Sequence, residues 1–312
     1  MIVVPAEFVS TTVAREGEAC TPWLDALPSL VAELLDRWNC EPDGAVMFGG
    51  VGIIVPVRRR DAGVAVLKVS FPHPGNRYEP DAFAAWAGRG AVVLHERDDD
   101  HFAMLLERAH STTLASLTDE DEIAEVAGRL NHLLAIDAPA ALPRLQDQAD
   151  SWAEDLEKDA RTLPHGLSSR ALDAARATID ELARTQPNLI IHGDFHGRNI
   201  LRADREPWLA VDPKGYAGDP ASDAGTLLKT RALTILTTPD PAKGLHRSLD
   251  IFAEAAHLDR ERVGRWAHLH AVQTTFWGHH HGYRRGRTGT ALTNLLALVT
   301  TLVNHLTPPR PA

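Results

Sequence analysis

Residues 189–223, LIIHGDFHGRNILRADREPWLAVDPKGYAGDPASD, decide the fold of this 312-residue chain. The apolar run 189–191 is followed by a loop that contains Asp194 and Asn199, and a second apolar run, 208–211, ends at Asp212. Short apolar runs bounded by turn residues predict β-strands. The pattern therefore predicts two adjacent short strands whose ends present three oxygen-bearing side chains.

These three side chains form a candidate set for phosphoryl transfer. A carboxylate within hydrogen-bond reach of a hydroxyl can orient it and accept its proton, which is the role predicted for Asp194. An amide and a second carboxylate are hard oxygen ligands of the kind that hold Mg²⁺ together with substrate phosphates, so Asn199 and Asp212 are predicted to bind the metal. Two ordinary strands with turn residues are the alternative, because Asp and Asn both favour turns.

The same stretch resembles the aminoglycoside phosphotransferases, a family of the protein-kinase-like superfamily. Their motif reads H-G-D-x-x-x-x-N, then I/V-D, then G-D-P-x-x-D, and the matching residues here are His192-Gly193-Asp194, Asn199, Val211-Asp212, Gly218-Asp219-Pro220 and Asp223. Gly193 stands where protein kinases have an arginine, and Pro213-Lys214 follows Asp212 in place of Phe-Gly. These departures favour a small-molecule kinase over a protein kinase that is switched by phosphorylation. The resemblance makes His192, Asp219 and Asp223 structural supports of the loop.

Residues upstream supply the nucleotide half of such a site. Lys68 is a single charge in the strand-like segment 64–70, and a charge in so apolar a strand needs a partner unless it reaches solvent. The resemblance assigns Lys68 to the α- and β-phosphates of ATP. It also implies that Glu79 pairs with Lys68, and Asp81 is the alternative partner.

Two backbone segments complete the expected nucleotide site. Gly49 and Gly50 lie in a glycine-rich turn where backbone N–H groups could approach phosphates, although a plain glycine turn fits equally well. The Leu-Leu-Glu-Arg run at 105–108 resembles the family's hinge, so the backbone of Glu107 and Ala109 is expected to bind the adenine. No G-x-x-x-x-G-K-[ST] motif is present in the sequence, which excludes a P-loop protein.

The remaining pattern predicts an α+β, bilobal, protein-kinase-like fold, with a small β-rich N-lobe at 1–107 and a larger, mostly helical C-lobe at 108–312. Pro28 is predicted to mark a helix start, and Thr118 is predicted to open another helix with Asp121 in its first turn. The expected helices are 23–39, 81–87, 118–134, 146–162, 168–185, 224–236, 245–256, 260–281 and 290–306.

Composition restricts the class of partner. The net charge of −10 disfavours nucleic acid and favours a cationic acceptor by electrostatic steering. Only two cysteines, Cys20 and Cys40, are present, which fits a reducing compartment. The N-terminus lacks the pattern of a signal peptide and no apolar run has the length of a membrane span, so a cytoplasmic protein with no membrane partner is expected. The sequence indicates no oligomeric state.

Two features of the C-terminal half remain as weaker hypotheses. The histidine run 279–281 suggests zinc, but no H-E-x-x-H motif accompanies it, so surface or acceptor-lining histidines are favoured. Asp150 and Glu154 share one face of a predicted helix and could meet a polycationic acceptor, although such charge runs are usually solvated.

Within the family, the chain is most similar to the streptomycin 6-kinases and hydroxyurea-type antibiotic resistance kinases, on the runs 86–92, 105–108 and 212–214. The resemblance implies that ATP and Mg²⁺ are the cofactors. It also implies transfer of the γ-phosphate to a hydroxyl of a small, hydroxylated, cationic acceptor, such as the aminoglycoside streptomycin. A metabolic kinase of an amino sugar is the alternative enzyme, and a catalytically silent nucleotide-binding protein is the alternative outside enzymes.

Overall fold

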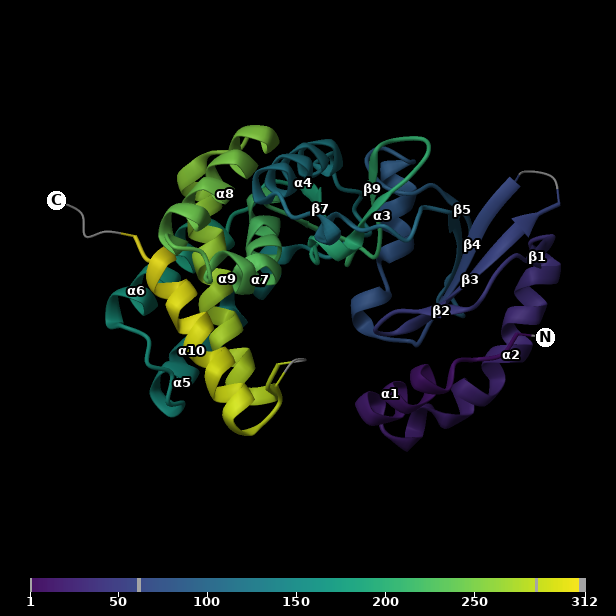
Figure 1. The fold of residues 1–312 in the computed structure, drawn as a ribbon, viewed down its shortest axis with the longest axis horizontal. Helices are drawn as coiled ribbons and strands as arrows, with labels where there is room; N and C mark the ends of the chain where they lie inside the picture. Colours follow the sequence, from purple (N-terminus) through teal and green to yellow (C-terminus); the bar gives the residue numbers. More distant parts are fainter. Residues whose placement is uncertain (1, 61–62, 284–285, 309–312) are drawn as a thin grey trace.

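The computed structural model describes residues 2–60, 63–283 and 286–308, which form a sheet-based body joined to a larger helical body (Figure 1). The predicted α+β class with a β-rich N-terminal part and a helical C-terminal part is therefore confirmed. The main sheet is antiparallel, in the order β1-β3-β4-β6-β5, with β2 paired to β3. Its strands are β1 (Cys40–Pro42), β2 (Met47–Phe48), β3 (Gly52–Arg59), β4 (Gly63–Ser70), β5 (Leu94–Asp98) and β6 (Ala103–Glu107).

Two N-terminal helices, α1 (Ala6–Glu16) and α2 (Thr21–Arg37), share a hydrophobic core with one face of this sheet. Pro28 lies inside α2, so the prediction that it starts a helix is wrong. Leu24, Leu27 and Val31 are buried on both sides of it, and this continuous apolar stripe outweighs the hydrogen bond that proline removes.

The alternation of β4 sets the position of Lys68. Leu67 and Val69 point into the core beneath the N-terminal helices, so Lys68 between them points to the opposite face of the sheet. Helix α3 (Glu79–Trp86) supplies Phe83 and Trp86 to the larger core of the C-terminal body. Consequently α3 connects the sheet to the helical body.

The helical body surrounds two short antiparallel ribbons. Strand β7 (Leu189–Ile191) pairs with β10 (Tyr216–Gly218), and β8 (Ile200–Arg202) pairs with β9 (Trp208–Ala210). The two predicted strands thus exist but are not paired with each other, because the chain forms a hairpin between β8 and β9 before β10 returns to β7. The helices are α4 (Glu120–Leu134), α5 (Ala149–Thr162), α6 (Ser169–Thr178), α7 (Asp223–Ile235), α8 (Pro241–Ala256), α9 (Arg260–His281) and α10 (Gly289–Leu306).

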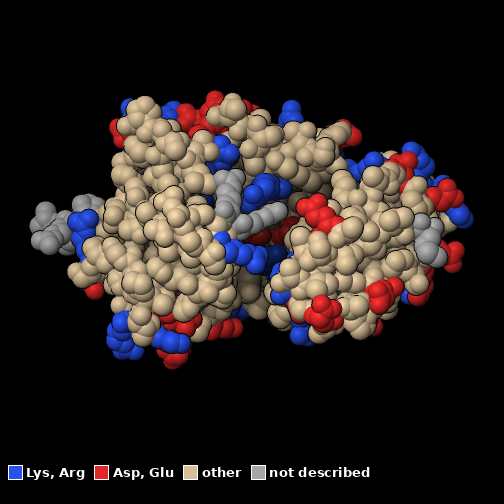
Figure 2. Space-filling view, turned by 60° about the horizontal axis from the view of Figure 1, so that its bottom comes forward, with Lys and Arg blue, Asp and Glu red and all other residues tan. Residues whose placement is uncertain are grey.

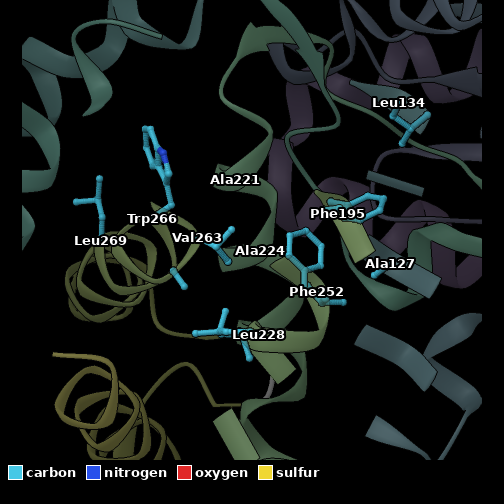
Figure 3. Close-up of a cluster of buried hydrophobic side chains, with 14 of the residues drawn as sticks. Ala127, Leu134, Phe195, Ala221, Ala224, Leu228, Phe252, Val263, Trp266 and Leu269 are labelled. Carbon is cyan, nitrogen blue, oxygen red and sulfur yellow. The ribbon is translucent and has the colours of Figure 1, made fainter. Parts of the chain in front are cut away.

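Figure 3 shows part of the core of this body, where Phe195 of the loop after β7 lies in the same cluster as Phe252 of α8 and Trp266 of α9. Phe195 is fully buried, so the loop that carries Asp194 is anchored in the core of the helical body.

Two helix ends differ from the sequence prediction. Asp119, not Thr118, caps α4, because its carboxylate accepts hydrogen bonds from the N–H groups of Asp121 and Glu122. The predicted helix 168–185 contains α6 and a π-helical turn, Ile179–Ala183. Among the described residues, no helix combines the length and the apolar character that a membrane crossing requires.

Candidate active site

Lys68 of β4, Glu79 of α3 and Asp212 after β9 meet between the two bodies. The Lys68 ammonium lies 2.5 Å from Glu79 Oε1 and 2.7 Å from Asp212 Oδ1. Glu79 is buried with 1% of its surface exposed, whereas the Asp212 side chain keeps 34%. Asp81, the alternative partner, forms an ion pair with Arg97 instead. Three segments that are distant in sequence therefore share one charge centre.

The single ammonium of Lys68 forms ion pairs with two carboxylates in this centre, those of Glu79 and Asp212. Burial alone would lower the pKa of Lys68, but Asp212 and Glu79 reverse the effect and raise its pKa above the ordinary value. Burial raises the pKa of Glu79 to about 7, against the opposing effect of Lys68. Burial also disfavours the charged form of Asp212, yet Lys68 and Lys214 hold its pKa far below the ordinary range. Asp212 is consequently ionised near neutral pH.

The loop 192–199 is held by a buried carboxylate. Asp223, at the start of α7, accepts hydrogen bonds from the backbone N–H groups of His192 at 3.0 Å and Gly193 at 2.9 Å. Burial lowers the pKa of His192 to about 4, so its ring is neutral at pH 7. The ring nitrogens of His192 bridge the Val211 carbonyl and the Asp194 N–H group, which ties the loop to the chain segment leading to Asp212.

Asp194 and Asn199 lie at opposite ends of this loop and contact each other. The Asn199 side-chain N–H₂ group donates to the Asp194 carbonyl at 3.0 Å and lies 3.4 Å from its carboxylate. His196 Nε2 is 3.7 Å from Asp194 Oδ1. The Asp194 side chain keeps 33% of its surface exposed, so its carboxylate is accessible to a ligand.

Two backbone positions in the site adopt left-handed conformations. Gly193 has φ +78°, and a Cβ there would lie 3.1 Å from Lys214 Cβ, so glycine fits the position on both counts. Asp212 has φ +59° although it carries a side chain, which costs about 1–3 kcal/mol. The chain holds Asp212 in this conformation by bonds on both sides: Val211 N–H donates to the Asn199 carbonyl and Lys214 N–H to the His192 carbonyl.

The expected hinge and the glycine turn both lie in the sheet-based body, at the end of β6 and between β2 and β3. The side chain of Glu107 is occupied by Arg205, which also donates to the Gly88 and Ala91 carbonyls. Gly49 and Gly50 form the exposed turn between β2 and β3, and Arg15 of α1 donates to the Gly50 carbonyl. Arg205 was missed in the sequence because an arginine in a polar turn carries no pattern of its own.

A hollow between the two bodies, with charged side chains on its walls, is visible in Figure 2. One cavity of about 300 Å³ is lined by Gly193, Asp223 and residues of α5, α7, α9 and β10. A second, of about 540 Å³, shares Trp152 and Gln273 with it and continues along α5 and α9. The second cavity contains the carboxylates of Asp155 and Asp159. The loop 192–199 thus opens onto a long cavity with acidic and aromatic walls.

The structure places most of the residues of the two weaker hypotheses on the C-terminal half. Asp150 forms an ion pair with Arg184, and the carboxylates in the cavity are Asp155 and Asp159. His280 Nε2 donates to the Asp159 carboxylate at 2.9 Å, and His280 and His281 of the histidine run line this cavity. Among residues 2–60, 63–283 and 286–308, no group of three His, Cys, Asp or Glu side chains could hold a metal ion. The orientation of α5, which faces α9 across the cavity, determines which carboxylates point inward, and the sequence pattern did not reveal it.

Fold and site together define a small-molecule kinase of the protein-kinase-like class. A solved structure of a choline/ethanolamine kinase family protein from Mesorhizobium loti superimposes with a TM-score of 0.58 at 15% identity, covering 88% of this chain and 94% of that one. This similarity confirms the protein-kinase-like fold.

The chain belongs to the aminoglycoside/hydroxyurea antibiotic resistance kinase family, whose model matches residues 37–282. A streptomycin 6-kinase from Streptomyces griseus is 36% identical over 87% of this chain and 88% of its own length. A hydroxyurea phosphotransferase from Kitasatospora aureofaciens is 33% identical over 89% of this chain and 80% of its own length. The predicted family and enzyme class, an ATP-dependent phosphotransferase that acts on a small molecule, are confirmed.

Proposed function

We propose that this kinase transfers the γ-phosphoryl group of ATP to a hydroxyl of streptomycin or of a closely similar aminoglycoside. Two observations carry the proposal: the Lys68–Glu79–Asp212 charge centre, and a cavity lined by Gly193 and Lys214 that shares walls with a second cavity containing the carboxylates of helix α5. The first part suits a nucleotide triphosphate, and the second suits a cationic acceptor.

In this proposal Lys68 binds the α- and β-phosphates of ATP. Glu79 fixes the ammonium by its 2.5 Å contact, so Lys68 is presented in one orientation before the nucleotide arrives. The backbone of Glu107 and Ala109 binds the adenine, and the turn at Gly49 and Gly50 covers the phosphates. We also propose that the boundary between the two lobes falls at this hinge, near residue 107. A further part of the proposal is that the protein acts in the cytoplasm, where ATP is available.

Magnesium fits the donor set that Asp212 and Asn199 offer. Asp212 is ionised and partly exposed, and the Asn199 N–H₂ group is bonded to Asp194, which leaves the amide oxygen for a hard cation. Bound there, Mg²⁺ would neutralise charge on the phosphates during transfer. Asp212 would then exchange part of its contact with Lys68 for the metal, which frees the ammonium for the phosphates.

Asp194 is proposed as the base. Its carboxylate orients the acceptor hydroxyl toward the γ-phosphorus and takes the hydroxyl proton as the new O–P bond forms and the bond to the leaving ADP breaks. Asp223, through the His192 and Gly193 N–H groups, holds the start of the loop that carries Asp194, and Gly193 next to it lines the cavity. Most of the catalytic power comes from positioning these groups, because phosphoryl transfer needs little activation of the attacking hydroxyl.

The acceptor cavity favours an aminoglycoside over hydroxyurea. Together its two parts offer several hundred cubic ångströms, far more than a molecule of a few atoms fills. Asp155 and Asp159 can pair with the guanidinium groups of streptomycin, and the ring faces of Trp152 and Trp277 suit the same cations. A hydroxyurea phosphotransferase among the relatives makes that compound the second candidate.

The test is release of ADP, in a coupled assay, with streptomycin, hydroxyurea and an amino sugar as separate acceptors. We expect Mg²⁺-dependent turnover with streptomycin and a phosphorylated product whose modified hydroxyl is identified by NMR. Asp155→Asn should raise KM for streptomycin and leave KM for ATP unchanged, and Asp150→Asn, on the same helix outside the cavity, is the matched control. Turnover with hydroxyurea or the amino sugar but not with streptomycin would overturn the proposal.

A further inference from the structure

A separate cavity of about 520 Å³ lies behind the charge centre. Its walls come from the end of β4, the start of α3, the turn between β5 and β6, and Ala141 of the segment that follows α4. Glu79 is the one residue of the proposed catalytic set that contributes to these walls. The volume is within the range of small-molecule sites.

Buried polar atoms without hydrogen-bond partners gather at this cavity. Ser70 Oγ, Asn76 Nδ2 and Glu79 Oε2 have none, although all three side chains are at least 96% buried. Buried polar groups are normally paired, and each exception requires an explanation. Three exceptions at one cavity indicate groups that a ligand satisfies after small side-chain rotations.

The chemistry of these atoms selects a hydroxylated ligand. Glu79 Oε2 needs a donor, an amide N–H₂ group needs an acceptor, and a serine hydroxyl takes either. Hydroxyl groups supply both. The walls carry two arginines and four carboxylates, which disfavours an anionic ligand. Most of these charges are already paired, since Glu79 contacts Lys68 and Arg97 contacts both Asp81 and Asp99. Tyr78 and Phe102 add ring surface for the apolar face of a sugar.

We propose that this cavity binds a small, neutral, polyhydroxylated molecule of monosaccharide size, and that its occupancy changes the affinity of the nucleotide site. The connection is Glu79: one carboxylate oxygen holds Lys68, and the other lacks a partner at the cavity. A hydroxyl bound to Oε2 fixes the Glu79 rotamer and therefore the position of Lys68. The inference goes beyond the proposed acceptor site, since none of its lining residues belongs to that site.

The test uses D-glucose and myo-inositol as probes, with binding measured by saturation-transfer NMR on the full chain. Ala141→Trp fills the cavity from an exposed position, and Ala140→Trp, its exposed neighbour outside the cavity, is the matched control. We expect saturable binding of at least one probe to wild type and to Ala140→Trp, and none to Ala141→Trp. Equal binding to both variants, or no binding of either probe to wild type, would overturn the site.

The coupling has its own readout. A bound probe should change the Kd of a non-hydrolysable ATP analogue by about fivefold, and the analogue should change the probe affinity by the same factor, because linkage is reciprocal for binding free energies. Only this measurement rests on the proposed function, whereas NMR binding of the probe alone would detect the site even in a protein with no kinase activity. If the protein released ADP from ATP with the probe present and streptomycin absent, the probe would be an acceptor, and this result would count against the inference.

Discussion

The charge centre makes a quantitative prediction for Lys68→Met. Glu79 is 1% exposed and takes its counter-charge from Lys68, so the variant leaves a buried carboxylate without a partner. Removal of one member of a buried ion pair costs about 3–5 kcal/mol of unfolding free energy. The lost contact with Asp212 adds less to this cost, because the Asp212 side chain is 34% exposed and water replaces the ammonium. The variant should therefore fold with a large loss of stability and no ATP turnover.

A double variant separates this explanation from a loss of packing. Lys68→Met with Glu79→Leu replaces the pair by apolar side chains, an exchange that is often neutral. It should regain most of the stability, with a coupling energy of about 2–3 kcal/mol, while activity stays absent. The assay is urea unfolding followed by circular dichroism. A double variant no more stable than Lys68→Met would refute the reasoning.

The pH dependence of the stability of Lys68→Met is an independent test of the same explanation. The folded-state pKa of Glu79, about 7 with Lys68 present, rises further when the ammonium is removed. A carboxyl whose folded pKa is raised costs stability above that pKa, and the cost disappears as pH falls and the carboxyl is protonated. The loss in Lys68→Met should therefore be largest above pH 7 and smaller in acid. The opposite trend would show that charge is not its cause.

Three further predictions follow from the loop and the core. Asp194→Asn should lower kcat about 10²- to 10⁴-fold with unchanged thermal stability, because this side chain is partly exposed. Asp223→Ala should cost about 1–3 kcal/mol in urea unfolding, since the buried N–H group of His192 loses its acceptor and the more exposed N–H group of Gly193 loses a second hydrogen bond. His192, His268 and His270 have pKa values lowered by burial to about 4, 4 and 3. Each stays neutral when folded and is protonated when unfolded below about pH 6.5, so stability should fall as pH drops from 6.5 toward 4, by about 1.4 kcal/mol per unit per histidine.

The catalytic segment was readable from sequence because its constraints are local. The order of Asp194, Asn199 and Asp212 requires a fixed loop length, and Gly193 is required where φ is +78°. The pairing of Lys68 with Glu79 was expected from the resemblance to a family, and the roles of all five residues stay proposals. The same motif named His192 and Asp223 as supports of the loop, and both hold it in the structure, whereas a support outside the motif, such as Arg205, was missed.

The elements that the sequence misjudged depend on long-range packing. The local preference of proline predicts a helix start at Pro28. The buried apolar stripe on both sides of it nevertheless extends α2 across the proline. Arg205 contacts Glu107 and the Gly88 and Ala91 carbonyls, which lie 98 to 117 residues away along the chain, and no short motif encodes such contacts. Tertiary contacts of this kind override local preference.

The proposed acceptor cavity shows why the substrate is harder to predict from the sequence than the type of reaction. Helix α5 carries two acidic stripes at four-residue spacing, Asp150 with Glu154 and Asp155 with Asp159, and helical periodicity treats them alike. The orientation of α5 distinguishes them, since it places buried Asp159 beside His280 of α9 and leaves Asp150 to Arg184 on the outside. Neighbouring residues of an α-helix lie about 100° apart around its axis, so a rotation of α5 of about that size would exchange the stripes, and it would leave Asp194 in place. Acceptor choice in this fold can therefore change through helix packing while the phosphoryl-transfer residues stay in place.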